Sequence, residues 1–260
     1  MMPLFSIIVV SLNTKYQFLK TINSIKNQTF KKYEVVIVDG KSKDGTIDEI
    51  KKIKNKKFKF IIEKDKGIYD AMNKGVRKCS GNWIIFLNSG DILFNQNVLK
   101  KISKKKINEV DILFGDTMIQ NKFFNYKSKA KNFNKKTFLM PFCHQSSLIR
   151  RNLLMKYCFD LKYKISSDFN FFIDIYYKSY SFLNLNLMIS KVTSGGLSDS
   201  NRKKVFQENI KIIRKYNYDI RYLIILYINI WFNHFKNFIK FLIPDYLNSF
   251  ILSIKYGKNK

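Results

Sequence analysis

The stretch from Gly81 to Asp91, GNWIIFLNSGD, ends in a turn whose side chains could hold a metal ion or a sugar. Its apolar run, Trp83 to Leu87, has the pattern of a strand that is buried on both faces of a mostly parallel sheet. Ligands of open α/β sheets bind just beyond the carboxyl ends of the strands, so the turn that follows is well placed for binding. A plain connection between two elements is the alternative interpretation of the same residues.

Strand and helix patterns alternate ahead of this turn. We expect strands at residues 4–10, 33–38, 58–62 and 83–87, with a helix in each gap between them. Right-handed crossovers between such strands produce a mostly parallel central sheet that is flanked by helices. The predicted fold class is therefore α/β. The third helix carries its apolar stripe at i, i+3, i+4, i+7 and i+8, namely at Ile68, Ala71, Met72, Gly75 and Val76.

The chain after Asp91 is less regular. Its patterns predict a helix that closes at 98–102, paired strands at 111–120 and 122–126, a mobile loop at 127–136, a strand at 146–149, a helix at 168–177, a strand at 182–189, a flexible turn at 195–196 and a helix at 202–216. These elements are expected to complete the same domain.

The chain is strongly basic, with 48 Lys and Arg against 19 Asp and Glu and a net charge of +29. This charge favours the anionic headgroups of a membrane surface, although an AT-rich genome would impose a similar composition. No helix-turn-helix, zinc-finger or RNP signature accompanies it, so we do not expect a nucleic acid partner. Three cysteines without a CxxC pair favour a reduced, cytoplasmic compartment, and the apolar N-terminus predicts a strand instead of a signal peptide.

The C-terminal part of the chain differs in composition. We predict a main domain at 1–219 and a helical tail at 220–260, because polar residues in the tail recur every three or four positions between broad apolar faces. Such a helix suits the plane of a membrane interface, at the inner face of the cytoplasmic membrane. A helix packed on the domain, or on a second subunit of a homodimer, is the alternative.

Several motifs resemble the nucleotide-sugar half of family 2 glycosyltransferases, which have the GT-A fold. They are FSIIVVSLN near the start, VVIVDGKSKDGT at 35–46, DKGIYDAMNKGV at 65–76, GNWIIFLNSGD at 81–91, CHQSS at 143–147, SSDFNFF at 166–172 and SGGLS at 194–198. Within the family the chain is most similar to bacterial enzymes that build capsule, O-antigen (lipopolysaccharide) and exopolysaccharide. The resemblance covers about residues 3 to 200.

The resemblance implies which residues bind the donor. Val10, Ser11 and Leu12 would line a slot for the nucleobase, and Asp39 would accept the hydrogen bond of a uracil-like N–H. Gly67 would let the chain pass beside the diphosphate. Asp39 as a plain turn former before a glycine is the alternative for that position.

The resemblance also implies a divalent cation, Mn²⁺ or Mg²⁺, held against the diphosphate. The family's turn carries two or three aspartates, whereas only Asp91 is charged in this chain. In our alignment Asn88 replaces the aspartate that contacts the ribose, and Asp91 is the principal metal ligand.

Transfer with inversion needs a base that takes the proton of the acceptor hydroxyl. The residue that matches the family's base is Asp168, which could also serve only as a helix N-cap. His144 would orient the donor phosphates or the acceptor, or else it is a buried histidine with a structural partner. 

The resulting hypothesis is an inverting glycosyltransferase that moves a sugar from a nucleoside diphosphate, UDP by expectation, to a lipid-linked or growing surface glycan. The rival from another class is a non-catalytic, basic protein that binds a membrane or a nucleic acid on a degenerate nucleotide-sugar fold. A nucleotidyltransferase is disfavoured because the chain lacks a basic glycine-rich loop near its N-terminus.

Overall fold

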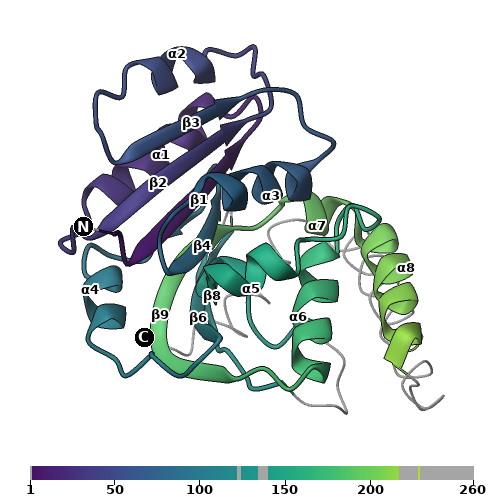
Figure 1. The fold of residues 1–260 in the computed structure, drawn as a ribbon. Helices are drawn as coiled ribbons and strands as arrows, with labels where there is room; N and C mark the ends of the chain where they lie inside the picture. Colours follow the sequence, from purple (N-terminus) through teal and green to yellow (C-terminus); the bar gives the residue numbers. More distant parts are fainter. Residues whose placement is uncertain (1, 122–123, 134–139, 217–227, 229–260) are drawn as a thin grey trace.

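A computed structural model describes residues 2–121, 124–133, 140–216 and 228. In this part of the chain a nine-stranded sheet carries helices on both faces (Figure 1). Its strands lie in the order β3-β2-β1-β4-β8-β6-β9-β5, and β7 pairs with β6.

The elements follow along the chain as β1 Phe5–Ser11, α1 Lys15–Lys26, β2 Tyr33–Asp39, α2 Thr46–Lys51, β3 Phe58–Ile62, α3 Ile68–Lys78, β4 Trp83–Asn88, β5 Ile92–Leu93, α4 Val98–Ser103, β6 Ile112–Gln120, β7 Asn125–Ser128, η1 His144–Ser146, β8 Ser147–Arg150, α5 Arg151–Lys156, α6 Ser167–Tyr177, β9 Phe182–Thr193, α7 Leu197–Ser200, α8 Arg202–Ile213 and η2 Arg214–Tyr216, where η marks a 3₁₀ helix.

The first half of the sheet is parallel, as the alternating patterns predicted. Strand β1 pairs with β2 and with β4, and β2 pairs with β3, all in parallel. Successive side chains of a strand point to opposite faces, and both faces are covered. Ile7 packs with Phe18 of α1 on one face, while Ile8 packs with Met72 of α3 on the other. These two apolar layers explain why β1 is buried along its whole length.

Helix α3 packs against β1 and β2 through Gly75. A Cβ added to Gly75 would lie 2.6 Å from Cγ2 of Ile8 and 3.3 Å from Cγ2 of Val38. Both neighbours are fully buried, so the absence of a side chain at residue 75 sets how closely this helix approaches the sheet.

The second half of the sheet is mixed. Strand β8 runs antiparallel to β4 and to β6, whereas β6 and β9 are parallel. The predicted strand at 122–126 is wrong in its bounds, because β7 covers Asn125–Ser128 and pairs with β6. The predicted mobile loop at 127–136 is wrong at its start for the same reason, and residues 134–136 lie outside the described part. Sequence patterns missed β5 and α5, which are too short to show a period.

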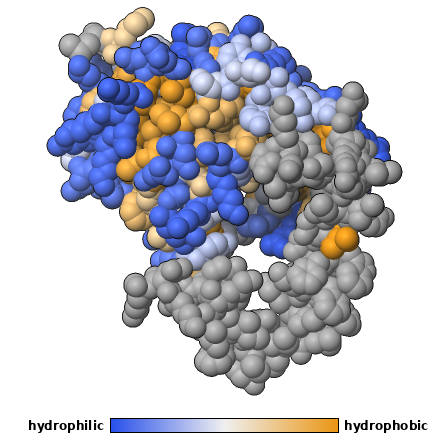
Figure 2. All heavy atoms as spheres, turned by 90° about the horizontal axis from the view of Figure 1, so that it is seen from below, coloured by the Kyte–Doolittle hydropathy of each residue, from blue (hydrophilic) through white to orange (hydrophobic). Residues whose placement is uncertain are grey.

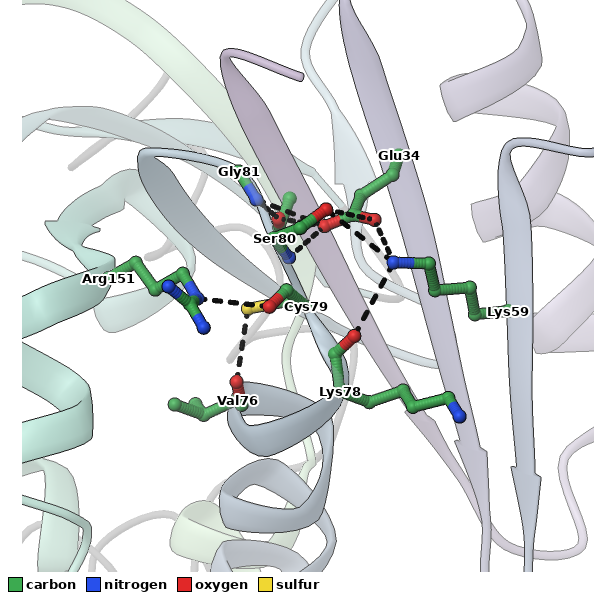
Figure 3. A network of polar contacts seen from close by, with 9 residues as sticks. Glu34, Lys59, Val76, Lys78, Cys79, Ser80, Gly81 and Arg151 are labelled. Carbon is green, nitrogen blue, oxygen red and sulfur yellow. Dashed lines mark hydrogen bonds and ion pairs between the residues drawn. The ribbon is translucent and has the colours of Figure 1, made fainter. Parts of the chain in front are cut away.

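The edge of the sheet at the amino ends of its strands is held by a buried carboxylate, Glu34 of β2 (Figure 3). Its oxygens accept hydrogen bonds from Ser6 Oγ at 2.6 Å, from the backbone N–H of Ser80 and from the N–H of Gly81 at 3.1 Å. Lys59 Nζ lies 2.7 Å from Glu34 Oε2. Burial raises the pKa of Glu34, but these partners outweigh burial and lower it to about 2. The cluster ties β1, β2, β3 and the start of β4 together.

The predicted tail helix and the boundary near residue 219 fall on residues outside the described part, apart from Ile228. Within the described residues, none of the helices combines the length and apolar character that crossing a membrane requires. One face of the molecule shows an apolar area bordered by hydrophilic residues (Figure 2).

Candidate active site

The parallel register brings four predicted site residues to one edge of the sheet. Ser11 is level with Asp39 across β1 and β2, and Val10 is level with Asn88 across β1 and β4. The chain leaves β1 toward β2 on one side and returns to β4 on the other side, so a topological switch point lies between β1 and β4. Crevices at such points are where open α/β sheets bind ligands. 

Asp91 is buried in the turn that follows β4. Its Oδ2 accepts hydrogen bonds from Gln145 Nε2 at 3.1 Å and from the backbone N–H of Asn88 at 3.2 Å. Thr21 of α1 makes two hydrogen bonds to the turn. Its hydroxyl donates to the Asp91 carbonyl oxygen at 2.8 Å and accepts the Gly90 N–H at 2.9 Å. Burial raises the pKa of Asp91 to about 6, against the opposing charge of His144 and the two hydrogen bonds.

Asp168 lies in the first turn of α6 and is held by two side chains. Its Oδ2 is 2.9 Å from His144 Nδ1, and its Oδ1 is 2.7 Å from the hydroxyl of Tyr69 in α3. Burial raises the pKa of Asp168, but the hydrogen bond and charge of His144 and the bond from Tyr69 outweigh it, so the pKa is lowered. Burial opposes protonation of His144, yet Asp168 and Asp91 raise its pKa overall. The pair therefore favours an imidazolium beside a carboxylate.

Adjacent residues of η1 connect the two acidic groups. His144 contacts Asp168, and Gln145 contacts Asp91. The two carboxylates predicted from sequence are thus linked through neighbouring residues of one short 3₁₀ helix. Two polar atoms of this site, Asn88 Oδ1 and His144 Nε2, are buried without a hydrogen-bond partner in the described residues. Buried polar atoms are almost always satisfied in folded proteins, so both point to a ligand.

The residues of the turn fit a divalent cation of the Mg²⁺ or Mn²⁺ type. Asp91 supplies a carboxylate and Asn88 an unsatisfied amide oxygen, and such ions prefer oxygen ligands and retain several waters. In the described ranges no group of three or more His, Cys, Asp or Glu side chains could enclose a metal.

Asp39, which we expected to contact the nucleobase, makes its side-chain hydrogen bonds within the turn that follows β2. Asp39 is fully buried, and its two carboxylate oxygens accept the N–H and the Oγ–H of Ser42, each at 2.7 Å. The structure thus gives Asp39 the turn-forming role that was the alternative, and contact with a nucleobase stays a prediction. Val10 and Ser11 are buried, whereas Leu12 is 53% exposed at the end of β1.

Gly67 stands at the start of α3 with a φ of 119°, a backbone conformation that favours glycine. Asp65 Oδ1 accepts its N–H at 2.9 Å. A Cβ on Gly40, just after β2, would lie 2.5 Å from Asp65 Oδ2 and 3.2 Å from Leu12 Cδ1. Asp65 therefore lies between the end of β2 and the start of α3.

Sequence reasoning missed Tyr69, Gln145 and Asp65 as members of this site. All three lie inside motifs that were recognised, DKGIYDAMNKGV and CHQSS. A usable signal was present in one case, since Tyr69 and Asn73 are polar-tipped residues at i and i+4 beside the apolar stripe of the helix. The contact between Gln145 and Asp91 joins residues 54 positions apart, and no local pattern encodes it.

Structural comparison shows that this is the GT-A fold. Staphylococcus aureus TarS (residues 1–349, in complex with UDP-GlcNAc) matches 83% of this chain over 68% of its own, with a TM-score of 0.60 and 20% identity. A mannosyltransferase from Pyrobaculum calidifontis, in complex with GDP-Man and Mn²⁺, matches 83% of this chain over 64% of its own, with a TM-score of 0.63 and 15% identity.

Sequence relatives point the same way. A PGL/p-HBAD biosynthesis glycosyltransferase of Mycobacterium bovis is 32% identical over 176 residues, 65% of this chain and 68% of that protein. The Escherichia coli enzyme WfgD, described as UDP-Glc:alpha-D-GlcNAc-diphosphoundecaprenol beta-1,3-glucosyltransferase, is 29% identical over 119 residues, 45% of this chain and 47% of that protein. This chain therefore matches only part of each. The sequence profile described as glycosyl transferase family 2 matches residues 6–173, which include both carboxylates of the site, and the chain belongs to that family.

Proposed function

We propose that the protein is an inverting glycosyltransferase that moves a sugar from a nucleoside diphosphate, UDP by preference, to a lipid-linked or growing surface glycan. The observation that carries the proposal is the connection of Asp91 to Asp168 through the neighbouring residues Gln145 and His144. One side of this site suits a diphosphate with its cation, and the other side offers a base.

Asp168 is the proposed base. Because its pKa is lowered, its carboxylate is ionised at neutral pH and ready to accept a proton. In the proposed step the acceptor hydroxyl gives its proton to Asp168 while its oxygen bonds to the anomeric carbon. The bond from that carbon to the diphosphate breaks at the same time, and its electron pair leaves with the diphosphate. Attack from the face opposite the leaving group inverts the anomeric carbon.

Asp91 and Asn88 are the proposed ligands of the cation. A bound Mn²⁺ or Mg²⁺ would neutralise the charge that grows on the departing diphosphate. Burial opposes protonation of His144, but Asp168 and Asp91 raise its pKa, which favours the positively charged imidazolium and adds favourable electrostatics on the same side. In that form its unpartnered Nε2 is free to donate a hydrogen bond to a substrate oxygen.

The choice of donor and acceptor rests on the relatives. TarS was solved with UDP-GlcNAc, and the WfgD description names UDP-Glc and a diphosphoundecaprenol acceptor. The net charge of +29 supports work at an anionic membrane surface, where each nearby Lys or Arg is worth on the order of 1 kcal/mol. Contact with the cytoplasmic membrane through the tail at 220–260, and the alternative of a homodimer, belong to the same proposal.

The test is hydrolysis of a panel of UDP-, GDP- and dTDP-sugars by the purified chain, with Mn²⁺ and without acceptor. Slow release of one nucleoside diphosphate, lost in the Asp168→Asn variant, is the expected result. A protein that binds these compounds but hydrolyses none, even with a membrane extract as the acceptor source, would be the non-catalytic rival. The anomeric configuration of the product, read by NMR, decides whether transfer inverts.

A further inference from the structure

One carboxylate of helix α8 accepts hydrogen bonds from three consecutive backbone N–H groups of the segment before α6. The amides of Lys164, Ile165 and Ser166 donate to Glu208 at 3.0, 2.9 and 3.0 Å. Glu208 is only 7% exposed, so these bonds are made away from solvent. A carboxylate that accepts several buried N–H groups is held firmly, and so are the amides that it binds.

The bound segment leads directly into the helix that carries the proposed base. Ser166 is the N-cap of α6, and Asp168 is its second helical residue. The Ser166 side chain makes no capping hydrogen bond, although Asp168 Oδ1 accepts the N–H of Phe169 at 2.9 Å. In an ordinary capping box a glutamate three residues into the helix binds the N–H of the N-cap residue. Here Glu208 performs that function from another helix, about forty positions later in the chain.

Helix α3 also makes hydrogen bonds to this segment. The Tyr69 hydroxyl lies 2.7 Å from the Ile165 carbonyl oxygen as well as from Asp168. Asn73, one turn further along α3, bonds both the N–H and the carbonyl oxygen of Phe159, at 3.0 and 2.8 Å. Side chains of both α3 and α8 therefore hold the segment from residue 159 to residue 168, which includes the first turn of α6.

Packing keeps α8 in register with α6. Ile212 and Ile213 of α8 form a buried cluster with Phe169 and Ile173 of α6. Figure 1 shows the two helices side by side at the edge of the molecule. Helix α8 also lies beyond the residues that the family profile covers, which end at 173.

We propose that Glu208 is a positioning residue, which sets the start of α6 and thereby the place of the Asp168 carboxylate relative to His144. The proposal rests on the role of Asp168 in the proposed function. In Glu208→Gln one of the two acceptor oxygens becomes an NH₂ donor and the charge is lost, so the amides of residues 164–166 are no longer all bound and the first turn of α6 can rearrange. Misplacement of a reacting group by about 1 Å costs about 100-fold in rate.

The experiment compares Glu208→Gln with Gln207→Ala, a control at an exposed position of the same helix. The first readout is the NMR titration of the His144 ring, with Asp168→Asn as the reference for full loss of the carboxylate. The chain has only two histidines, so the His144 signal can be assigned with a His234→Gln variant. The second readout is the split of kcat and KM for the nucleotide sugar found in the hydrolysis panel, with UDP and Mn²⁺ titrated by calorimetry.

We expect Glu208→Gln to move the pKa of His144 downward, toward the Asp168→Asn value, and to lower kcat by about 10- to 100-fold. The KM for the sugar donor and the stoichiometry of UDP binding should stay as in the wild type. The control should change none of these. If Glu208→Gln does not fold, Glu208→Asp keeps the charge on a shorter side chain and should give the same changes in weaker form.

A wild-type His144 titration together with a wild-type kcat in the folded Glu208 variant would overturn the proposal. A loss of UDP binding sites in proportion to the loss of rate would also overturn it, because that pattern indicates unfolding. If the wild type hydrolyses none of the sugars while Glu208→Gln still shifts the His144 titration, the proposed function fails and the placement of Asp168 by Glu208 stands.

Discussion

His144 Nδ1 lies 2.9 Å from Asp168 Oδ2, so the proposed base forms an ion pair with His144. The next residue, Gln145, donates a hydrogen bond to Asp91. This contact couples the two ends of the site, because any movement of η1 changes the surroundings of both carboxylates. It also sets the charge of the base. An ion pair that lowers the pKa of Asp168 keeps the base ionised, although it makes the carboxylate a weaker proton acceptor.

Replacing Asp168 with Asn should reduce turnover of the nucleotide sugar by about 10²- to 10⁴-fold, the usual contribution of a general base. Asn has the same shape but no negative charge to accept a proton. UDP binding in the presence of Mn²⁺, measured by calorimetry, should stay near the wild-type value. Turnover at the wild-type rate in this variant would remove Asp168 from the mechanism.

Replacing His144 with Gln should move the acidic limb of the pH–rate profile to higher pH. His144 lowers the pKa of Asp168, so without it the pKa of Asp168 rises, because burial is then opposed only by the hydrogen bonds from Tyr69 and from the Phe169 N–H. The base is then protonated, and inactive, at pH values where it is ionised in the wild type. The measurement is kcat/KM across the acidic range. An unmoved limb would show that another group controls it.

Replacing Asp91 with Asn should weaken Mn²⁺-dependent binding of UDP at least about tenfold, since loss of even an outer-shell partner of a metal ligand costs that much. Asn retains the size of the side chain but removes the only charge of the turn. Calorimetric titration of UDP with and without Mn²⁺ separates the metal effect from the nucleotide effect. Ser89→Ala, a change in the same turn that removes no charge, serves as the control.

Replacing Glu34 with Gln should destabilise the fold by about 3 kcal/mol at neutral pH. The partners of Glu34 lower its pKa from 4.5 to about 2, and a pKa difference of one between folded and unfolded protein corresponds to about 1.36 kcal/mol of stability. A lowered pKa contributes stability that is present above about pH 4.5 and is lost as the pH falls toward 2. The difference between variant and wild type, measured by urea unfolding, should therefore shrink across that range. A constant difference would mean that packing, not charge, accounts for it.

Replacing Gly75 with Ala should destabilise the fold although it improves helix propensity. The propensity gain is about 1 kcal/mol, but the new Cβ would lie 2.6 Å from Cγ2 of the fully buried Ile8. Overpacking of a tight core costs about 1–3 kcal/mol, so the clash should cancel or exceed the gain. Thermal unfolding measures the balance, with Gly196→Ala as a control because a Cβ there meets no atom within 4 Å. A clear rise in Tm for Gly75→Ala would contradict the packing argument.

The first four strands and their helices could be predicted because their signals are local. Residues 58–62 were predicted as a strand with the observed bounds, and the apolar stripe from Ile68 to Val76 lies on the buried face of α3. Strand β5 has two residues, a single period of the strand pattern, and α5 has six, fewer than two helical turns, so neither shows a repeat. The bounds of β7 depend on pairing with β6, which is a property of two strands together.

The sequence by itself determined the family and the parallel arrangement of the first strands, and it singled out Asp91 and Asp168 as candidate site residues, because motifs and periods are carried by neighbouring residues. Only the tertiary structure decided that Gln145 and His144 join these carboxylates, that Ser42 occupies both oxygens of Asp39, and that Glu208 caps α6. Each of these contacts depends on how separate elements pack. Such packing is fixed by the whole core and leaves no trace in the spacing of residues along the chain.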